Sequence, residues 1–106
     1  MDAFPALRFA RAARLLGAAA RASGLAVPAF RSPPRLPGTP RTIRRHPGGA
    51  VVSVQLRGRP FDAVVDDMVE GIVVANRLTG EAAARLRASL REVAATTGDG
   101  ARPEAA

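Results

Sequence analysis

Arginine is the residue type in this chain whose number and spacing point most directly to a chemistry. Residues 3–60 contain eleven arginines and no acidic residue, whereas residues 61–106 contain eight of the nine acids. The first 60 residues therefore carry a formal charge of about +10, and the last 46 carry about −3. Arginine holds phosphate through two parallel hydrogen bonds, and a cationic segment without acids attracts polyanions. The charge distribution therefore predicts phosphate binding by the first 60 residues.

Some of these arginines are expected to gather at a β-hairpin that follows a proline-rich segment. Once the hairpin forms, cations from its two strands lie close together and repel one another. Phosphate groups would relieve that repulsion and release bound counterions. The alternative is that local acids or solvent neutralise the same side chains. The predicted nucleic-acid-binding residues are Arg35, Arg41, Arg44, Arg45, Arg57 and Arg59.

The acids of the second half do not have the pattern of a catalytic or metal-binding site. Asp62, Asp66 and Glu70 share one helix face, together with Asp67 beside it, and a soluble helix exposes such a face to water. The chain has no cysteine, and His46 is its only histidine, so a transition-metal site would lack its usual ligands. We therefore predict no metal, no cofactor and no enzymatic activity. An alternative role for these acids is to pair with the basic half, within one chain or across a dimer.

The first predicted element is a basic amphipathic helix within residues 1–24. Its arginines fall mainly on one side and its small apolar residues on the other. This Arg-rich and nearly acid-free segment also resembles an organellar transit peptide. A docked helix, a free arm and a transit peptide are therefore three open alternatives for it.

Residues 25–40 are predicted to be a stiff connector. Five of the thirteen residues from 28 to 40 are proline. Proline lacks the backbone N–H that helices and central strands require. We therefore expect no regular secondary structure from residue 28 to residue 40.

Residues 41–95 are predicted to form a small hairpin-helix-helix unit. Residues 41–46 and 50–57 have the composition of strands, and Pro47-Gly48-Gly49 suits the turn between them. The second strand alternates valines with polar residues. One of its faces is therefore expected to pack on a core, and the other to face water or a ligand.

Two helices are predicted after the hairpin, at residues 60–78 and 81–95. The first has an apolar face that covers close to half of its circumference, and Gly71 at the edge of this face is expected to allow a close helix contact. Residues 96–106 are rich in small and polar residues and are predicted to be a disordered tail.

The predicted fold class is α+β: a basic N-terminal helix, a Pro-rich connector, and a β-hairpin packed on two C-terminal helices. A folded unit of about 55 residues is marginally stable alone, and without cysteine it has no disulfide to support it. We therefore expect a homodimer. The predicted self-association residues are Phe61, Val65, Met68 and Ile72.

The order strand, helix, helix in residues 51–95 resembles the ribbon-helix-helix family of dimeric DNA-binding proteins. In that family, strands from two chains pair and enter the major groove. The resemblance covers about 45 residues, is architectural, and includes no specific motif. It implies that the outward strand residues Ser53, Gln55 and Arg57 contact base edges.

The sequence predicts a small non-enzymatic basic binding protein that associates with nucleic acid through its Arg-rich first 60 residues. The alternative is a protein–protein interaction or dimeric adaptor module that uses the apolar face of residues 61–78. A ribbon-helix-helix-like DNA-binding protein is the third hypothesis. No apolar run approaches the ~20 residues that span a bilayer, so no membrane span is predicted and a cytoplasmic location is the default expectation.

Overall fold

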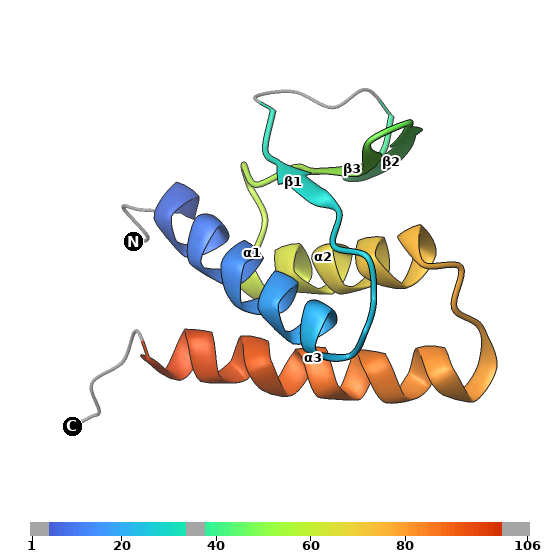
Figure 1. Cartoon of the computed structure of the whole chain (residues 1–106). Coiled ribbons are helices and arrows are strands. Elements are labelled where there is room, and N and C mark those ends of the chain that lie inside the picture. The colour runs from blue at the N-terminus through green and yellow to red at the C-terminus, as the bar shows by residue number, and fades with distance from the viewer. Residues whose placement is uncertain (1–4, 34–37, 101–106) are drawn as a thin grey trace.

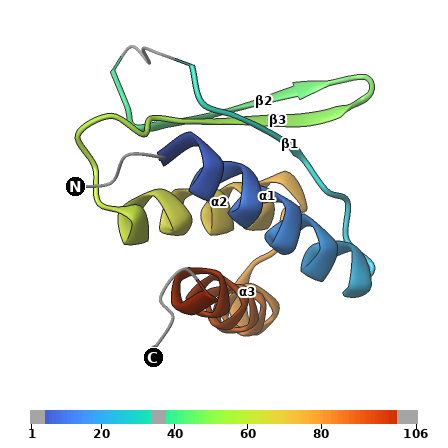
Figure 2. The ribbon, with the colours of Figure 1, turned by 90° about the vertical axis from the view of Figure 1, so that its left-hand side faces the viewer.

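The computed structural model describes residues 5–33 and 38–100, and the chain has an α+β fold (Figure 1). The described elements in chain order are α1 (Pro5–Ala22), β1 (Ala29–Arg31), β2 (Arg41–His46), β3 (Gly49–Val54), α2 (Phe61–Ala75) and α3 (Gly80–Gly100). These helices lie on one side of the sheet. α1 and α2 form the middle layer, and α3 lies beneath them, away from the sheet (Figure 2).

The two strands of the predicted hairpin are β2 and β3. They pair antiparallel, from Arg41 opposite Val54 to His46 opposite Gly49. Gly49 has a φ of 134°, a conformation that side chains with a Cβ rarely adopt, so glycine suits the turn. The hairpin is therefore confirmed, but its second strand is Gly49–Val54 and ends three residues before the predicted residue 57.

β1 adds a third strand, which the sequence did not predict. It pairs in parallel with β3, with Phe30 opposite Val52, and this gives the sheet order β1-β3-β2. The expectation of no regular structure in residues 28–40 was therefore wrong for β1. This stretch lies between two prolines but retains its own N–H groups, so it can serve as an edge strand. Residues 34–37 of the connector lie outside the described residues.

The core lies around α2, which has the sheet on one side and α3 on the other (Figure 2). β3 turns Val52 and Val54 toward the helices, and both side chains are fully buried. This confirms the predicted alternation along the strand. The wide apolar face of α2 is covered within one chain, because the sheet, α1 and α3 pack against it. Its buried residues are Val64, Val65, Met68, Val69, Gly71, Ile72 and Val73.

α1 is docked on this core. Phe9, Ala12, Leu16 and Ala20 are buried in the same cluster as the apolar residues of α2 and α3. The expectation of a folded unit of about 55 residues was therefore wrong, because it left α1 out. Of the alternatives for this helix, a docked helix describes its place in the fold.

The end of α2 lies three residues before the predicted boundary, at Ala75 instead of residue 78. The N–H of Arg77 donates to the carbonyl of Val74 at 3.0 Å, and the N–H of Leu78 donates to the carbonyl of Val73 at 3.1 Å. This pair of bonds is the Schellman motif, which requires a left-handed residue after the helix. Arg77 takes that role with a φ of 56°.

α3 is longer than predicted. It continues to Gly100, whereas the sequence predicted an end at residue 95 and a disordered tail over residues 96–106. The prediction was wrong for residues 96–100, because extending a formed helix costs far less free energy than starting one. Residues 101–106 lie outside the described residues.

Candidate nucleic-acid interface

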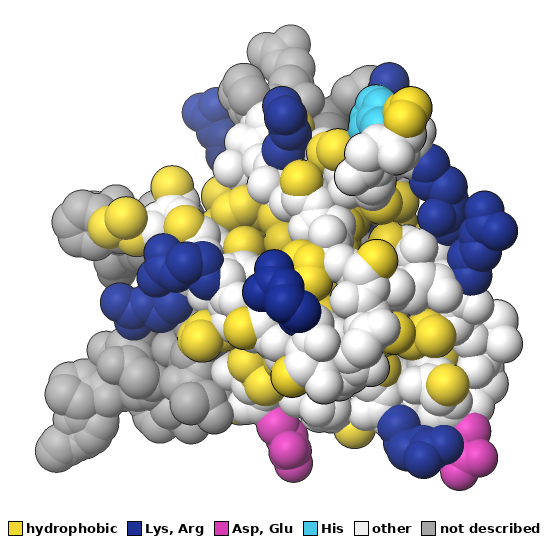
Figure 3. Space-filling model, in the orientation of Figure 1, with side chains coloured by type: hydrophobic (Ala, Val, Ile, Leu, Met, Phe, Trp, Pro, Cys, Tyr) yellow, Lys and Arg dark blue, Asp and Glu magenta, His cyan; other side chains and the backbone are white. Residues whose placement is uncertain are grey.

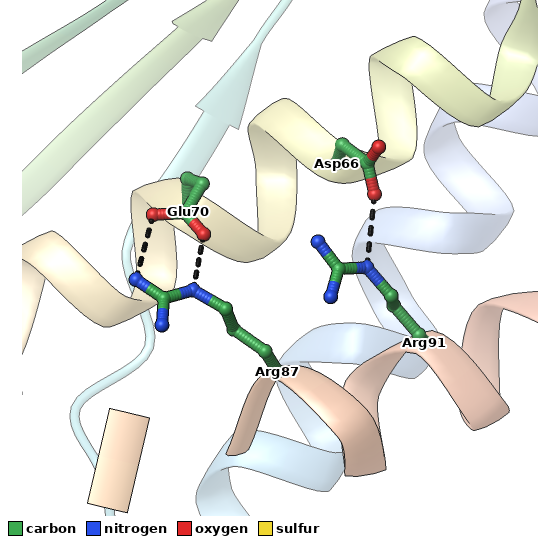
Figure 4. A network of polar contacts seen from close by, with 4 residues as sticks. All are labelled: Asp66, Glu70, Arg87 and Arg91. Carbon is green, nitrogen blue, oxygen red and sulfur yellow. Dashed lines mark hydrogen bonds and ion pairs between the residues drawn. The ribbon is translucent and has the colours of Figure 1, made fainter. Parts of the chain in front are cut away.

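Asp66 and Glu70 on the acidic face of α2 pair with arginines of the same chain. Asp66 accepts a hydrogen bond from Arg91 at 3.1 Å, and Glu70 accepts two from Arg87, one of them at 3.2 Å (Figure 4). Both arginines belong to α3. These ion pairs join the two helices on the side of the molecule away from the sheet.

A third ion pair connects α2 to the basic half of the chain. Arg59 Nη1 lies 2.6 Å from Asp67 Oδ2, and the same nitrogen donates to the carbonyl oxygen of Gln55. Both side chains of the pair are largely buried. The expectation that the acids pair with the basic half within one chain therefore holds for Asp67, whereas Asp66 and Glu70 pair with α3.

Glu70 is held in its ionised form by this arrangement. Its pKa lies below the ordinary value of 4.5, chiefly because Arg87 donates hydrogen bonds to it, while partial burial acts in the opposite direction. The charges of Arg87, Arg41 and Arg91 lower the pKa further. Arg41 therefore lies on the helix side of the sheet and interacts electrostatically with the carboxylate of Glu70.

Arg45 stabilises the end of α2. Its guanidinium donates to the carbonyl oxygens of Val74 at 2.8 Å and Ala75 at 3.1 Å. These are carbonyls of the last helical turn, where the helix dipole places partial negative charge. Arg45 therefore joins the hairpin to α2.

Asn76, the only asparagine of the chain, fixes the segment that leads into β1. Its side-chain amide exchanges hydrogen bonds with both backbone groups of Ala26, at 2.9 and 3.0 Å, and also donates to the carbonyl of Ile72. The end of α2 is thus tied to a segment 50 residues earlier in the chain. This contact positions β1, and with it Arg31, at the edge of the sheet.

The predicted arginine cluster is therefore divided by the fold. Arg41, Arg45 and Arg59 contact or face the helices, as described above. Arg44 is exposed on the outer face of the sheet, Arg57 is exposed in the turn after β3, and Arg35 lies outside the described residues. Of the six predicted residues, only two described ones remain fully available to a ligand.

The outer face of the sheet, on the side opposite the helices, has a composition suited to phosphate. Strand pairing places Arg31, Ser53 and Thr42 side by side across the three strands. The adjacent outward row contains Ala29, Val51 and Arg44. Two exposed arginines thus lie on opposite edge strands, with the hydroxyl of Ser53 on the strand between them and that of Thr42 on the same strand as Arg44. In the part of the chain that the structure describes, no helix covers this face (Figure 2).

The outer side of α1 adds further exposed arginines to this half of the molecule. Arg11, Arg14 and Arg21 project away from the core, and among the described residues no ion pair or hydrogen bond involves their side chains. Figure 3 shows arginines over α1 and around the sheet, while the acidic side chains visible on this face lie at its lower edge, over α3. Arg31 and Arg44 lie on the outer face of the sheet, and the α1 arginines lie on the solvent side of that helix. We call the five residues Arg11, Arg14, Arg21, Arg31 and Arg44 together the basic face.

The predicted self-association residues lie mostly inside the fold. Val65 is 5% exposed, and Met68 and Ile72 are fully buried. Phe61 is half-buried, with the guanidinium of Arg8 4.1 Å from its ring centroid. The reason for expecting a dimer, an apolar face too wide for one chain to cover, therefore does not hold. These residues form the core and do not form an open docking surface.

The sheet differs from the arrangement implied by the ribbon-helix-helix resemblance. β3 has β1 on one edge and β2 on the other, so its edges are occupied within the chain. A dimer that pairs this strand with its copy would require one neighbour to leave. Ser53 does lie on the outward side of β3, as the alternation predicted, whereas Gln55 follows the end of the strand and its N–H donates to the carbonyl of Pro40.

Sequence reasoning did not identify Arg31 and the α1 arginines as members of a candidate site. Arg31 was hidden because its segment was expected to have no regular structure. The stretch Ala29-Phe30-Arg31 is too short for its alternation to stand out in the sequence, and its outward residues are recognised only once it pairs with β3. The α1 arginines were assigned to a helix whose position was left open.

Other classes of site are not supported by the described residues. Within them, no group of three His, Cys, Asp or Glu side chains could hold a metal ion. In the same part of the chain, no helix has both the length and the apolar character needed to cross a bilayer.

Comparison of the chain with protein-family models, with curated proteins and with solved structures finds no match. Function is therefore inferred from the chain's own surface and its charges.

Proposed function

We propose that the protein is a non-enzymatic binding protein that associates with nucleic acid through its basic face. The observation that carries the proposal is the separation of charge in three dimensions. Three acids of α2 are neutralised by Arg59, Arg87 and Arg91, all within the chain. The basic face comes from residues 3–60, which contain no acid, so its arginines are left without neighbouring carboxylates from their own half.

Electrostatics explains why a polyanion would bind to such a surface. Clustered guanidinium groups repel one another, and neutralising them with phosphates releases counterions from the nucleic acid. The net charge of +7 further raises the rate of encounter with a polyanion. Binding of this kind carries little sequence preference, because it is directed at the phosphate backbone.

A fluorescence-anisotropy titration of labelled nucleic acid at several salt concentrations tests the proposal. If four arginines contact phosphates of a duplex, the plot of log K against log salt should have a slope of about −3.6. Replacing Arg31 and Arg44 together with alanine should flatten that slope by up to about 2 units. Absence of binding even at low salt, where the electrostatic attraction is strongest, would contradict the proposal.

The matched control is Arg85→Ala, compared with the single variant Arg44→Ala. Both remove one exposed arginine and change net charge equally, but Arg85 lies on α3, outside the basic face. Arg85→Ala should leave the salt slope nearly unchanged, whereas Arg44→Ala should flatten it by about 1 unit. Equal effects of the two substitutions on the salt slope would mean that binding depends on the net charge of the protein and not on the basic face.

A second candidate, a dimeric or adaptor module, is favoured by two exposed leucines on α1. Leu7 is 66% exposed and Leu15 is 39% exposed, and their spacing of eight residues places them on one side of the helix. This candidate moves the docking surface from α2 to α1. Sedimentation equilibrium should then show a dimer that Leu7→Ser with Leu15→Ser dissociates, and a monomer at all concentrations would eliminate self-association through this surface.

A further inference from the structure

The outer face of the sheet lacks aromatic side chains, and this bears on which form of nucleic acid it suits. Proteins that bind single strands on a sheet stack the bases on exposed aromatic rings. Among the described residues, Phe9 is buried in the core and Phe30 packs against it from the inner side of the sheet. Phe61 lies beneath Arg8 at the start of α2. None of these rings belongs to an outward row of the sheet.

The outward rows instead offer groups that bind the sugar-phosphate backbone. Arg31 and Arg44 lie on the two edge strands, the hydroxyl of Ser53 lies on the central strand, and that of Thr42 lies on β2, the strand of Arg44. Arginine and hydroxyl side chains are common donors to phosphate oxygens. Because Ser53 and Thr42 are short, they let a backbone approach the sheet closely while the longer arginines reach around it.

The spacing of the two arginines suits two strands better than one. They are separated by two strand spacings across the sheet and by two residues along it. With strands about 4.8 Å apart and a rise of about 3.4 Å per residue, their Cα atoms lie roughly 12 Å apart. That distance is close to the ~12 Å width of the major groove in B-form DNA. Arginine side chains that start from Cα atoms at this separation can reach phosphates on the two sides of a groove.

We infer that the outer face of the sheet binds the phosphate backbone of a double-stranded nucleic acid, an inference that rests on the proposed function. In this arrangement Arg31 contacts phosphates of one nucleic-acid strand and Arg44 contacts phosphates of the other. The class of ligand is thus a duplex, and unpaired bases are not read. Phosphates of duplex DNA and duplex RNA share this chemistry, so both belong in the test.

The experiment compares four fluorescent probes of about 20 nucleotides or base pairs under identical salt, since affinities at different salt cannot be compared. The probes are one single-stranded DNA, one single-stranded RNA, and the duplex of each. We expect at least one duplex to bind about tenfold or more tightly than its single strand, because the sheet provides no stacking for unpaired bases. A difference between the two duplexes would identify the preferred source of the phosphates.

Single-residue variants test whether the preference for duplexes arises from the outer face of the sheet. Arg31→Ala and Arg44→Ala should each weaken duplex binding severalfold, and Arg85→Ala on α3 should not. Ser53→Phe places a ring on the central strand β3, between the edge strands that carry the two arginines, where strands readily accept aromatic residues. It should raise affinity for single strands and narrow the preference for the duplex. Circular dichroism melting of each variant confirms that the fold is retained.

The outcomes separate two failures. If single strands bind as tightly as duplexes, or if Arg31→Ala and Arg44→Ala act no more strongly than Arg85→Ala, the duplex assignment to the sheet is wrong, while nucleic-acid binding itself survives. If no probe binds at low salt, the proposed function and the duplex assignment both fail.

Discussion

Gly71 of α2 lies directly against Val52 of β3. A Cβ atom placed on Gly71 would be 2.6 Å from Val52 Cγ1 and 2.9 Å from Val52 Cγ2, closer than such atoms normally approach. The absence of a side chain therefore sets how closely α2 packs on the central strand. The sequence predicted that Gly71 allows a close helix contact, and its neighbour proves to be a strand.

Gly71→Ala should destabilise the fold. The added methyl group overpacks the helix–sheet contact, at a typical cost of about 1–3 kcal/mol, partly offset by about 1 kcal/mol from the better helix propensity of alanine. Urea unfolding followed by circular dichroism measures the change. In a Val52→Ala background, which makes room for the methyl group, the same substitution should cost less, and strict additivity of the two changes would contradict a direct clash.

Arg45→Ala should destabilise the protein by about 0.5–1.5 kcal/mol, because two carbonyls at the end of α2 lose a cationic donor. Thermal unfolding monitors the effect. Arg44→Ala is the matched control, since Arg44 is the next residue in β2 but is exposed on the outer face. Its substitution should change stability by no more than about 0.5 kcal/mol. An equal loss in both variants would show that the contacts of Arg45 with α2 contribute nothing specific.

Arg77→Gly should stabilise the protein by up to about 1 kcal/mol. The left-handed conformation of Arg77 is strained for a residue with a Cβ, and the relief exceeds the extra backbone entropy that glycine brings to the unfolded chain. The melting temperature should therefore rise. An unchanged or lower melting temperature would mean that the Arg77 side chain stabilises the fold in a way that offsets its strain.

The Glu70–Arg87 pair should make stability depend on acid pH. The pKa of Glu70 in the folded state is lower than 4.5, so its ionised form contributes stability that is fully present above the pKa of the unfolded chain. That contribution is lost as pH falls from about 4.5 through the folded-state pKa. Urea unfolding from neutral pH to pH 3 measures the loss.

Glu70→Gln should flatten this acid-side decline while lowering stability at neutral pH, since a neutral amide cannot replace the ion pair. Glu81→Gln provides the control, because Glu81 is an exposed carboxylate in the first turn of α3. Its substitution should leave most of the decline intact. A decline that persists unchanged in Glu70→Gln would assign it to other carboxyl groups.

Much of the secondary structure follows from local sequence. The hairpin was predictable because valines alternate with polar residues in β3, and because Gly49 suits a backbone angle that other residues avoid. The position of α2 was predictable from the helical spacing of its apolar residues. By contrast, β1 was missed, because a three-residue strand in a proline-rich segment shows no strand signal until a neighbouring strand pairs with it.

The candidate site was only partly predictable for a related reason. The sequence places most arginines in one half of the chain. The direction of each side chain, however, depends on its position in the alternation of a strand and on the acids or backbone carbonyls that the fold brings near it. Adjacent residues Arg44 and Arg45 illustrate this, since one faces solvent and the other binds the end of α2. Arg59 likewise has its partner, Asp67, in the following helix.

The sequence by itself determined the separation of charge, because which residues are acidic or basic is fixed along the chain. It also determined most helices and the hairpin, whose periodicity is local. Only the tertiary structure decided that α1 docks, that β1 joins the sheet, and which arginines remain exposed. These depend on contacts between residues far apart in the chain, such as Asn76 with Ala26, and the free energy of such contacts is realised only when the whole core assembles.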